Sequence, residues 1–365
     1  MALPSSNALT FNAKELSAGQ HETQISEAGE INLHKHFKHC TKNPKHENFI
    51  PVDTFSLEHL PDDCRDEELY DCVKILADLT VRILVRVTSP NRPDVWPGTN
   101  TPYPLHDLRG SNELKTGTGR LWMVSTFTQE QEERRASSIT SCPCSKCRHS
   151  SNPSKIWGEF YVVTATHVVF DETEAKETSC RLFYNGETCP RVIIDGFDAY
   201  FDKALEYDRC WLRCATCDLE LVQVVQEKIK SFDTLWEKLQ EKFEPSRDEH
   251  KLAIVVSHPH GCSKQISVGQ WVDKYNVAGD YKESKFTYTT CTCPGSSGAM
   301  VYFLGYSGGK YWLHLHFGGL NAELNHSGVG FDVAKNYDNV EEYDLENLSD
   351  EAVDDIMNKL LFESD

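Results

Sequence analysis

The sequence contains no run of the roughly 18 apolar residues that a transmembrane helix requires. Residues 1–19 are polar and mixed, without the basic stretch and apolar core of a secretory signal peptide. Positive charge is also scarce, because 37 Lys and Arg stand against 56 Asp and Glu, a formal net charge of −19. These absences argue against membrane and nucleic-acid partners and favour a cytoplasmic protein.

Cysteine, in contrast, is abundant, with 14 residues in a chain of 365. In a small secreted domain they would suggest disulfides, but clusters in a long chain without a signal peptide favour free thiols or metal ligands. Cys142, Cys144 and Cys147 could bind a structural zinc if one more ligand is supplied. Candidates for that ligand are His149, Cys180, Cys189, Cys214 and Cys217. A set of free or redox-active thiols is the alternative.

The two ends of the chain differ from the part between them: the N-terminal residues show no sustained hydrophobic period, and the C-terminal residues are strongly acidic. Residues 1–64 predict a polar, flexible N-terminal arm, although the run His34-Lys-His36-Phe-Lys-His39 beside Cys40 could bind a metal. Residues 336–365 predict an acidic tail that ends in a short amphipathic helix, which Ser349 can cap.

Short strands separated by turn signals fill residues 65–335. A helix that begins near Asp66 is followed by a half-buried strand over 81–87, with Arg82 and Arg86 on its polar face. Further strands are expected at 160–164, 252–256, 286–288 and 299–303. The pattern predicts a mostly β protein of two packed antiparallel β-barrels, over about 78–217 and 250–335, because an α/β sheet would alternate strands with helices.

A long helix is inserted between the two groups of strands, over residues 218–246. Its apolar residues recur at alternating intervals of three and four: Val222, Val225, Ile229, Phe232, Trp236, Leu239 and Phe243. Such a stripe can bind a partner helix through the 222–243 face, or it can pack against the rest of the chain. The sequence leaves both open.

The segment Cys293-Pro-Gly-Ser-Ser297-Gly carries the most chemical information. A serine hydroxyl becomes a nucleophile when a base takes its proton, and attack on a carbonyl also needs backbone amides aimed at the developing oxyanion. A tight Gly-x-Ser-Gly turn can expose the Ser297 hydroxyl and direct the amides of Gly295 and Ser297 into one oxyanion hole. By itself the motif is weak, since such turns are common.

Two further segments complete a candidate catalytic triad. His167 ends the apolar strand Phe160–Thr164, and Asp208 opens another strand, where it could orient the imidazole. The order His, Asp, Ser excludes the subtilisin and α/β-hydrolase arrangements. The spacings, 41 residues from 167 to 208 and 89 from 208 to 297, approach the roughly 45 and 93 of chymotrypsin.

On these residues the chain resembles the trypsin-like (chymotrypsin-fold) serine proteases, in the style of the intracellular and HtrA-like members. Thr164-Ala-Thr-His167 is similar to their Thr-Ala-Ala-His, and Gly-Ser-Ser297-Gly-Ala to Gly-Asp-Ser-Gly-Gly. Gly117-Thr-Gly119 and His258-Pro-His-Gly261 resemble segments that open the two barrels. Ser296 replaces the family's Asp before the nucleophile, which implies activity without zymogen-type cleavage.

The resemblance also places a specificity pocket on the strand that comes after the nucleophile turn. His316 and Gly318 belong to a His-x-Gly-Gly run similar to that of chymotrypsin-fold proteases that select Glu or Gln. It implies that His316 hydrogen-bonds the substrate side chain; a histidine bonded within the barrel is the alternative.

The sequence thus predicts a serine endopeptidase that acts on protein or peptide substrates through an acyl-enzyme, with no cofactor required for catalysis. Two other classes stay open: a binding module that keeps the fold without catalysis, and a zinc-dependent interaction protein built on the cysteine cluster. Because all three triad positions are filled, the enzyme is favoured.

Overall fold

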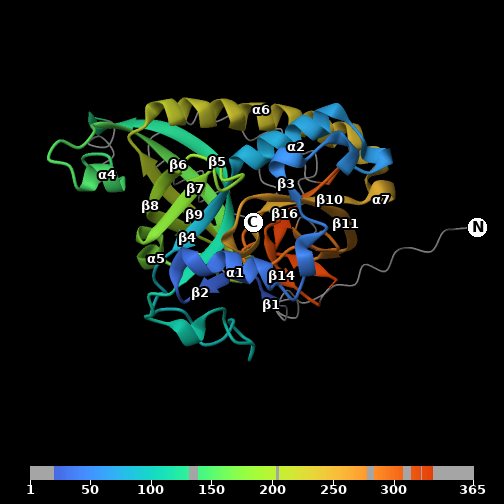
Figure 1. Ribbon diagram of the computed structural model, residues 1–365, viewed down its shortest axis with the longest axis horizontal. Coiled ribbons are helices and arrows are strands. Elements are labelled where there is room, and N and C mark those ends of the chain that lie inside the picture. Colours follow the sequence, from blue (N-terminus) through green and yellow to red (C-terminus); the bar gives the residue numbers. More distant parts are fainter. Residues whose placement is uncertain are drawn as a thin grey trace, which may run out of the picture.

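Two antiparallel sheets lie side by side in the computed structural model, which describes residues 20–130, 139–202, 205–277, 283–306, 314–321 and 323–331. Figure 1 shows the first sheet in green and the second in orange to red, with α6 (Leu219–Phe243) and α2 (Glu67–Leu79) together along the top. The mostly β composition expected from the sequence is confirmed for these residues.

The first sheet closes on itself. Its strand order is β2-β5-β4-β7-β8-β9-β6, and β5 also pairs with β6, so six strands form a ring with β2 added outside it. The strands are β2 (Gln24–Ser26), β4 (Thr80–Val85), β5 (Leu114–Thr128), β6 (Ile156–Ala165), β7 (Thr178–Leu182), β8 (Val192–Phe201) and β9 (Arg209–Thr216).

The second sheet curls without a continuous closing ladder. Its order is β1-β14-β15-β12-β11-β10-β13, and one isolated bridge, Met300 to Leu315, joins the residues just before β13 and β14. Two short strands, β3 and β16, pair with β11 and β12. The strands are β1 (Gln20–His21), β3 (Ile50–Pro51), β10 (Leu252–Ser257), β11 (Gln265–Asn276), β12 (Glu283–Tyr288), β13 (Val301–Phe303), β14 (His316–Gly319), β15 (Asn325–Ser327) and β16 (Gly330–Phe331).

The predicted helix after Asp66 is confirmed as α2. The Asp66 carboxylate caps it by accepting a hydrogen bond of 2.9 Å from the Leu69 amide. Four further α-helices are short: α1 (Leu33–Lys38), α4 (Ser145–Arg148), α5 (Glu172–Lys176) and α7 (Arg247–His250). The 3-10 helices span Gly29–Asn32, Pro44–His46, Val52–Thr54, Leu57–His59, Asp62–Cys64, His106–Leu108, Leu205–Tyr207, Glu244–Ser246 and Pro259–Gly261.

The heptad stripe of α6 packs inside the chain. Six of its seven residues are buried, and the helix lies against α2 and β5. Asp218 caps its start by accepting from the Leu221 amide at 3.1 Å. Of the two interpretations open from the sequence, packing against the chain's own domain therefore holds. The expected partner surface on 222–243 is already covered.

The prediction of a flexible arm over residues 1–64 is wrong for residues 20–64. Here β1, β2 and β3 each pair with a strand of the main sheets, and α1 packs on the 259–261 turn. This segment also covers β4, where Arg82 is buried and donates to Glu30 at 2.7 Å and to the Gly261 carbonyl at 2.9 Å. The observed strand, β4, is consequently buried on both faces, in contrast to the half-buried strand expected over 81–87; Arg86 comes after it and is exposed.

Some expectations lie outside the described residues: the structure of residues 1–19, the acidic tail over 336–365 and its helix. Within the described ranges, none of the helices combines the length and the apolar character needed to cross a bilayer.

Candidate active site

His167 and Asp208 are brought together by the pairing of β6 with β9. Their last register pair, Ala165 with Arg209, sets the residues that come after β6 beside the one that precedes β9. Asp208 Oδ2 lies 2.6 Å from His167 Nδ1, and its Oδ1 accepts from the His167 backbone amide at 2.9 Å. Two contacts to one carboxylate fix both the position and the tilt of the imidazole.

Ser297 approaches the same imidazole from the second sheet. Its Oγ lies 2.8 Å from His167 Nε2. The turn that carries it is pressed against the first sheet, because Thr118 N donates to the Ser297 carbonyl at 2.9 Å. At Gly298, where φ is +82°, an added Cβ would lie 2.2 Å from Thr164 Oγ1, so only glycine fits this close approach. The three residues expected to form the triad thus lie in one hydrogen-bonded relay.

The two amides expected to form the oxyanion hole converge on one oxygen. Gly295 N donates to the Glu22 carbonyl at 2.5 Å, and Ser297 N donates to the same oxygen at 3.3 Å. Gly295 has φ +99°, a conformation that favours glycine. A carbonyl of the chain's own N-terminal segment therefore occupies the position where a developing oxyanion would be stabilised.

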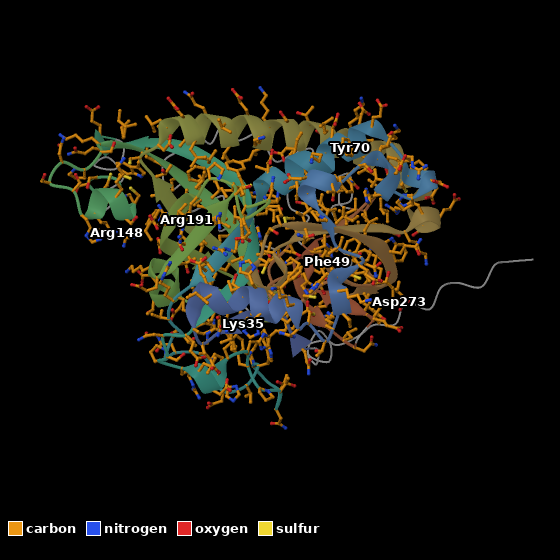
Figure 2. The ribbon with its side chains drawn as sticks, viewed as in Figure 1. Lys35, Phe49, Tyr70, Arg148, Arg191 and Asp273 are labelled. Atoms are coloured by element: carbon orange, nitrogen blue, oxygen red, sulfur yellow. The ribbon has the colours of Figure 1, made fainter. Side chains whose placement is uncertain are left out.

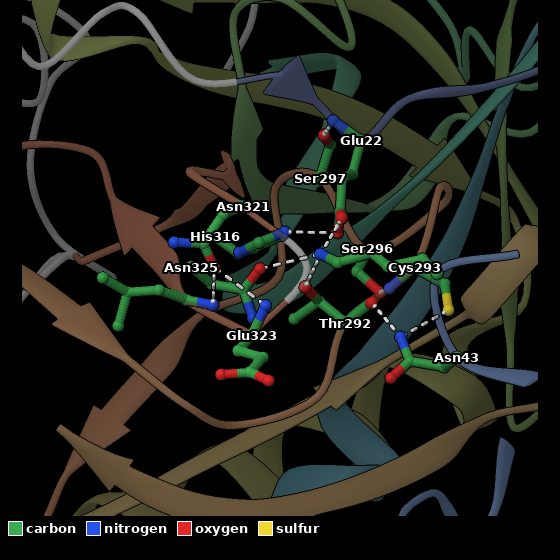
Figure 3. A network of polar contacts seen from close by, with 12 residues as sticks. Glu22, Asn43, Thr292, Cys293, Ser296, Ser297, His316, Asn321, Glu323 and Asn325 are labelled. Atoms are coloured by element: carbon green, nitrogen blue, oxygen red, sulfur yellow. Dashed lines mark hydrogen bonds and ion pairs between the residues drawn. The ribbon is translucent and has the colours of Figure 1, made fainter.

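That segment crosses the whole site. Glu22 N donates to Ser297 Oγ at 2.9 Å, and Figure 3 shows Glu22 next to Ser297, with His316 also in the network. His21 packs against His167, with ring centroids 5.6 Å apart. Burial lowers the pKa of His21 to about 3, so this neighbour is neutral. As a result the side chains of Ser297 and His167 are 0% exposed.

The expected specificity residue His316 contacts an acidic side chain. Its Nε2 lies 2.8 Å from Glu22 Oε2, and its Nδ1 lies 2.6 Å from the Tyr288 hydroxyl. Burial would raise the pKa of Glu22, but the bond from His316 and the ion pair with Lys42 lower it to about 2. His316 is therefore bonded within the sheet, as the alternative interpretation expected, and also to the carboxylate of Glu22, a residue of the chain's own N-terminal segment.

Lys42 is the pocket residue that sequence reasoning missed. Its ammonium contacts the Glu22 carboxylate and donates to Asn325 Oδ1 at 2.7 Å and Thr292 Oγ1 at 3.1 Å. Gly318 lines the backbone side, where an added Cβ would lie 2.0 Å from the Gln20 carbonyl oxygen. No pattern in the sequence points to Lys42, because the surrounding residues have no period that would place them.

A buried ion pair supports the far side of His167 and was also missed. Arg92 donates to the His167 carbonyl at 3.1 Å and to Glu174 Oε2 at 2.7 Å. Both side chains are 0% exposed. The Pro-rich loop that carries Arg92 thereby holds the turn on which His167 lies.

The cluster of Cys142, Cys144 and Cys147 lies away from this site. Their Sγ atoms lie within 4.8 Å of one another, and the Cys217 thiol contacts both Cys144 and Cys147. The hydrogen bond between Cys142 and Cys144 lowers the pKa of Cys144 to about 5 and raises that of Cys142. In Figure 2 Arg148, one residue beyond the cluster, lies at the margin of the molecule, far from Phe49.

Of the other candidates for a fourth ligand, Cys180 and Cys214 lie 3.9 Å from each other in the core of the first sheet. Cys217 contacts two of the three thiols, but its sulfur is outside the group whose ligand atoms all lie within 4.8 Å of one another. All 14 cysteines are free thiols.

No family model matches the sequence, and no curated protein matches it either. The solved structures that resemble the chain include proteases. They include the active form of the Rv3671c protease from M. tuberculosis, at 11% identity and a TM-score of 0.33, over 72% of this chain and 82% of that one. The HtrA-type protease AlgW with a decapeptide matches at 12% identity and a TM-score of 0.33, over 79% and 66%. Identities and TM-scores this low do not indicate the function of this chain.

Proposed function

We propose that this chain is a serine endopeptidase in which Ser297 is the nucleophile, His167 the general base and Asp208 the residue that orients it. The observation that carries the proposal is the unbroken relay from Asp208 Oδ2 through the imidazole to Ser297 Oγ, with separations of 2.6 and 2.8 Å. Two amides facing one carbonyl oxygen give the same relay an oxyanion hole.

The reaction begins when Ser297 Oγ attacks a peptide carbonyl and His167 Nε2 takes its proton. Asp208 stabilises the imidazolium, and the amides of Gly295 and Ser297 stabilise the oxyanion. His167 then gives the proton to the leaving amine, and an acyl-enzyme remains on Ser297. Water, deprotonated by His167, hydrolyses this ester. Buried surroundings strengthen each of these charge contacts.

The first prediction concerns Ser297 itself. A fluorophosphonate probe should label the folded protein, and Ser297→Ala should abolish labelling. Peptide hydrolysis should fall by roughly 10⁴-fold or more, because nucleophile and base act as a unit. Ser150→Ala, in the exposed loop after α4, is the matched control and should keep full labelling. Labelling that survives Ser297→Ala would refute the proposal. So would a folded but unlabelled Glu22→Lys variant, in which an ammonium opposite Lys42 keeps residues 20–24 off Ser297.

For the substrate, we propose a preference for Glu immediately before the cleaved bond. His316 and Lys42 both contact the Glu22 carboxylate and leave it ionised in a buried pocket. A basic side chain there would meet an ammonium and gain no partner, and a large aromatic one would leave the same groups unpaired.

A peptide library should therefore be cleaved after Glu, and His316→Leu should lower kcat/KM for Glu peptides by about 10- to 100-fold. That range corresponds to one lost hydrogen bond to a charged group, about 1.5–3 kcal/mol. His316→Gln, which keeps a donor, should recover part of the rate. Cleavage chiefly after basic or large aromatic residues would contradict the assignment.

We further propose that Cys142, Cys144 and Cys147, with Cys217, bind a structural zinc, remote from catalysis. Elemental analysis should show about one equivalent of zinc less in Cys144→Ser than in the wild type, as expected for one four-coordinate site. Cys189→Ser, which changes a half-buried thiol outside the cluster, should not alter the zinc content. Equal zinc in wild type and Cys144→Ser would end this proposal.

A further inference from the structure

Residues 20–26 cross the active site in an extended conformation and join both sheets. On one side of Glu22, β1 pairs antiparallel with β14, with Gln20 opposite Gly319 and His21 opposite Gly318. On the other side, β2 pairs antiparallel with β5 of the first sheet, with Gln24 opposite Thr116. Adding a strand to an open sheet edge is a common way to bind a peptide. The Glu22–Thr23 bond is thus held between two sheets.

The contacts of Glu22 hold its carbonyl group at the turn that carries Ser297. Its carbonyl oxygen accepts from the amides of Gly295 and Ser297, and its own amide donates to Ser297 Oγ at 2.9 Å. Its carboxylate lies on His316 in the pocket behind, and His21 packs on the base. Backbone, side chain and preceding residue are all fixed, which is the positioning that speeds an intramolecular reaction.

The segment also closes the site. Glu22 is 4% exposed, Thr23 7% and Gln24 8%, and no part of the Ser297 or His167 side chains reaches solvent. A second peptide cannot reach the nucleophile while residues 20–24 lie there. The first peptide that Ser297 can attack is therefore the chain's own segment 20–24.

On the basis of the proposed function, we infer that the chain is its own first substrate and cleaves the peptide bond between Glu22 and Thr23. Ser297 Oγ bonds to the Glu22 carbonyl carbon, and its proton passes to His167 Nε2. The carbon–nitrogen bond to Thr23 breaks, and the proton goes to the Thr23 nitrogen. One water then hydrolyses the ester, which leaves a Glu22 carboxylate and restores the Ser297 hydroxyl.

The experiment follows the purified full chain over time by intact mass and N-terminal sequencing. The wild type should convert to a chain that begins at Thr23, and Ser297→Ala should stay intact. The rate should not change when the protein is diluted about tenfold, because reaction within one molecule is first-order. Intact wild type that the fluorophosphonate probe still labels would overturn this inference and leave the protease proposal standing. Absence of cleavage in the wild type together with absence of labelling in folded Glu22→Lys, where the segment no longer covers Ser297, would refute the two together.

Two matched charge reversals test the pocket. Glu22→Lys places an ammonium against Lys42 and should abolish cleavage at this bond, yet speed labelling of Ser297, because the segment no longer docks. Glu27→Lys makes the same change five residues on, at an exposed position, and should be cleaved like the wild type. Cleavage of Glu22→Lys after residue 22 at the wild-type rate would overturn the inference.

A second cluster of ligand atoms, independent of these contacts, lies behind the nucleophile turn. Cys40, His46, His260 and Cys293 each direct one ligand atom to a common point, all within 4.8 Å of one another. His46, His260 and Cys293 are buried. The distances fit a tetrahedron: zinc bonds of about 2.3 Å to sulfur and 2.0–2.1 Å to nitrogen imply edges of about 3.8 and 3.5 Å. The Cys40 and Cys293 Sγ atoms are 3.5 Å apart, and His46 Nε2 is 3.6 Å from Cys293 Sγ.

His260 shows that this cluster is arranged for a ligand. Its Nδ1 lies 2.8 Å from Gln24 Oε1, an acceptor, so Nδ1 carries the proton and Nε2 has a free lone pair. That Nε2 is buried and has no hydrogen-bond partner, in a side chain only 3% exposed. A histidine whose second nitrogen is bonded to a side-chain oxygen is the usual arrangement at metal sites.

The geometry points to a Cys₂His₂ zinc site formed by Cys40, His46, His260 and Cys293. It would tie residues 40–46 to Cys293, two residues before Gly295. In the sequence, Lys42 lies between the ligands Cys40 and His46. The side chain of the next residue, Asn43, donates to the Cys293 sulfur at 3.2 Å. A metal here would hold Lys42 in the pocket and the oxyanion turn in place.

Zinc content should be measured in the Ser297→Ala background, where the chain stays intact. Cys40→Ser should contain about one equivalent less zinc than this parent, since one site is lost. Cys291→Ser, two residues from Cys293 but outside the cluster, should lose none. A chelator should lower the Tm of the parent by more than that of Cys40→Ser, which retains only the zinc proposed for the 142–147 cluster. Unchanged zinc content in Cys40→Ser, or a Cys40–Cys293 disulfide in unreduced protein, would overturn the site.

Discussion

The close approach of the 293–298 turn to β5 and β6 is the constraint on which the rest of the site depends. Thr118 sits at its centre: its amide donates to the Ser297 carbonyl at 2.9 Å and its hydroxyl donates to the Gly295 carbonyl at 2.8 Å. The Thr118 carbonyl in turn accepts from Thr164 Oγ1 at 2.8 Å. These bonds couple the turn that carries the nucleophile to the strand that leads to the base. Since a backbone amide and two threonine hydroxyls make this coupling, the Ser297–His167 separation is set by how the two sheets pack.

The N-terminal segment adds a second, electrostatic constraint. A carboxylate that is 4% exposed loses most of its hydration, which is costly unless it is paired and hydrogen-bonded. Lys42 and His316 supply that compensation from opposite ends of the chain. The segment is therefore held by its charge as well as by its strand pairings. Arg92 and Glu174 meet the same condition on the other side of His167, where neither is exposed.

The sequence predicts those parts of the fold and the site that are marked by a local pattern of residues, and it does not predict contacts between residues far apart in the chain. His167, Asp208 and Ser297 carry local signals, at a strand end, a strand start and a glycine-flanked turn, and their order limits the fold. The contacts of residues 20–64 carry none. Strands of two or three residues, such as β1 and β2, are too short for a period, and the Lys42–Asn325 contact spans 283 residues. For α6, the stripe predicted burial of one face, but periodicity cannot say what covers it.

Ser296 links the sequence to the chemistry proposed for the N-terminal segment. In the resembling family an Asp at this position often binds a newly freed N-terminal ammonium, and that ion pair forms the site. Here the Ser296 hydroxyl lies 3.0 Å from the Ser257 hydroxyl and also accepts from the Cys293 amide at 3.2 Å, so the turn is held without any ion pair. The oxyanion amides are already directed at a carbonyl while the chain is intact. Cleavage at Glu22 would therefore have a different physical role: it would empty a site that is already formed. The strand pairing of β2 with β5 would keep the new Thr23 end near the cleft, and only the part that ends at Glu22 would have to leave.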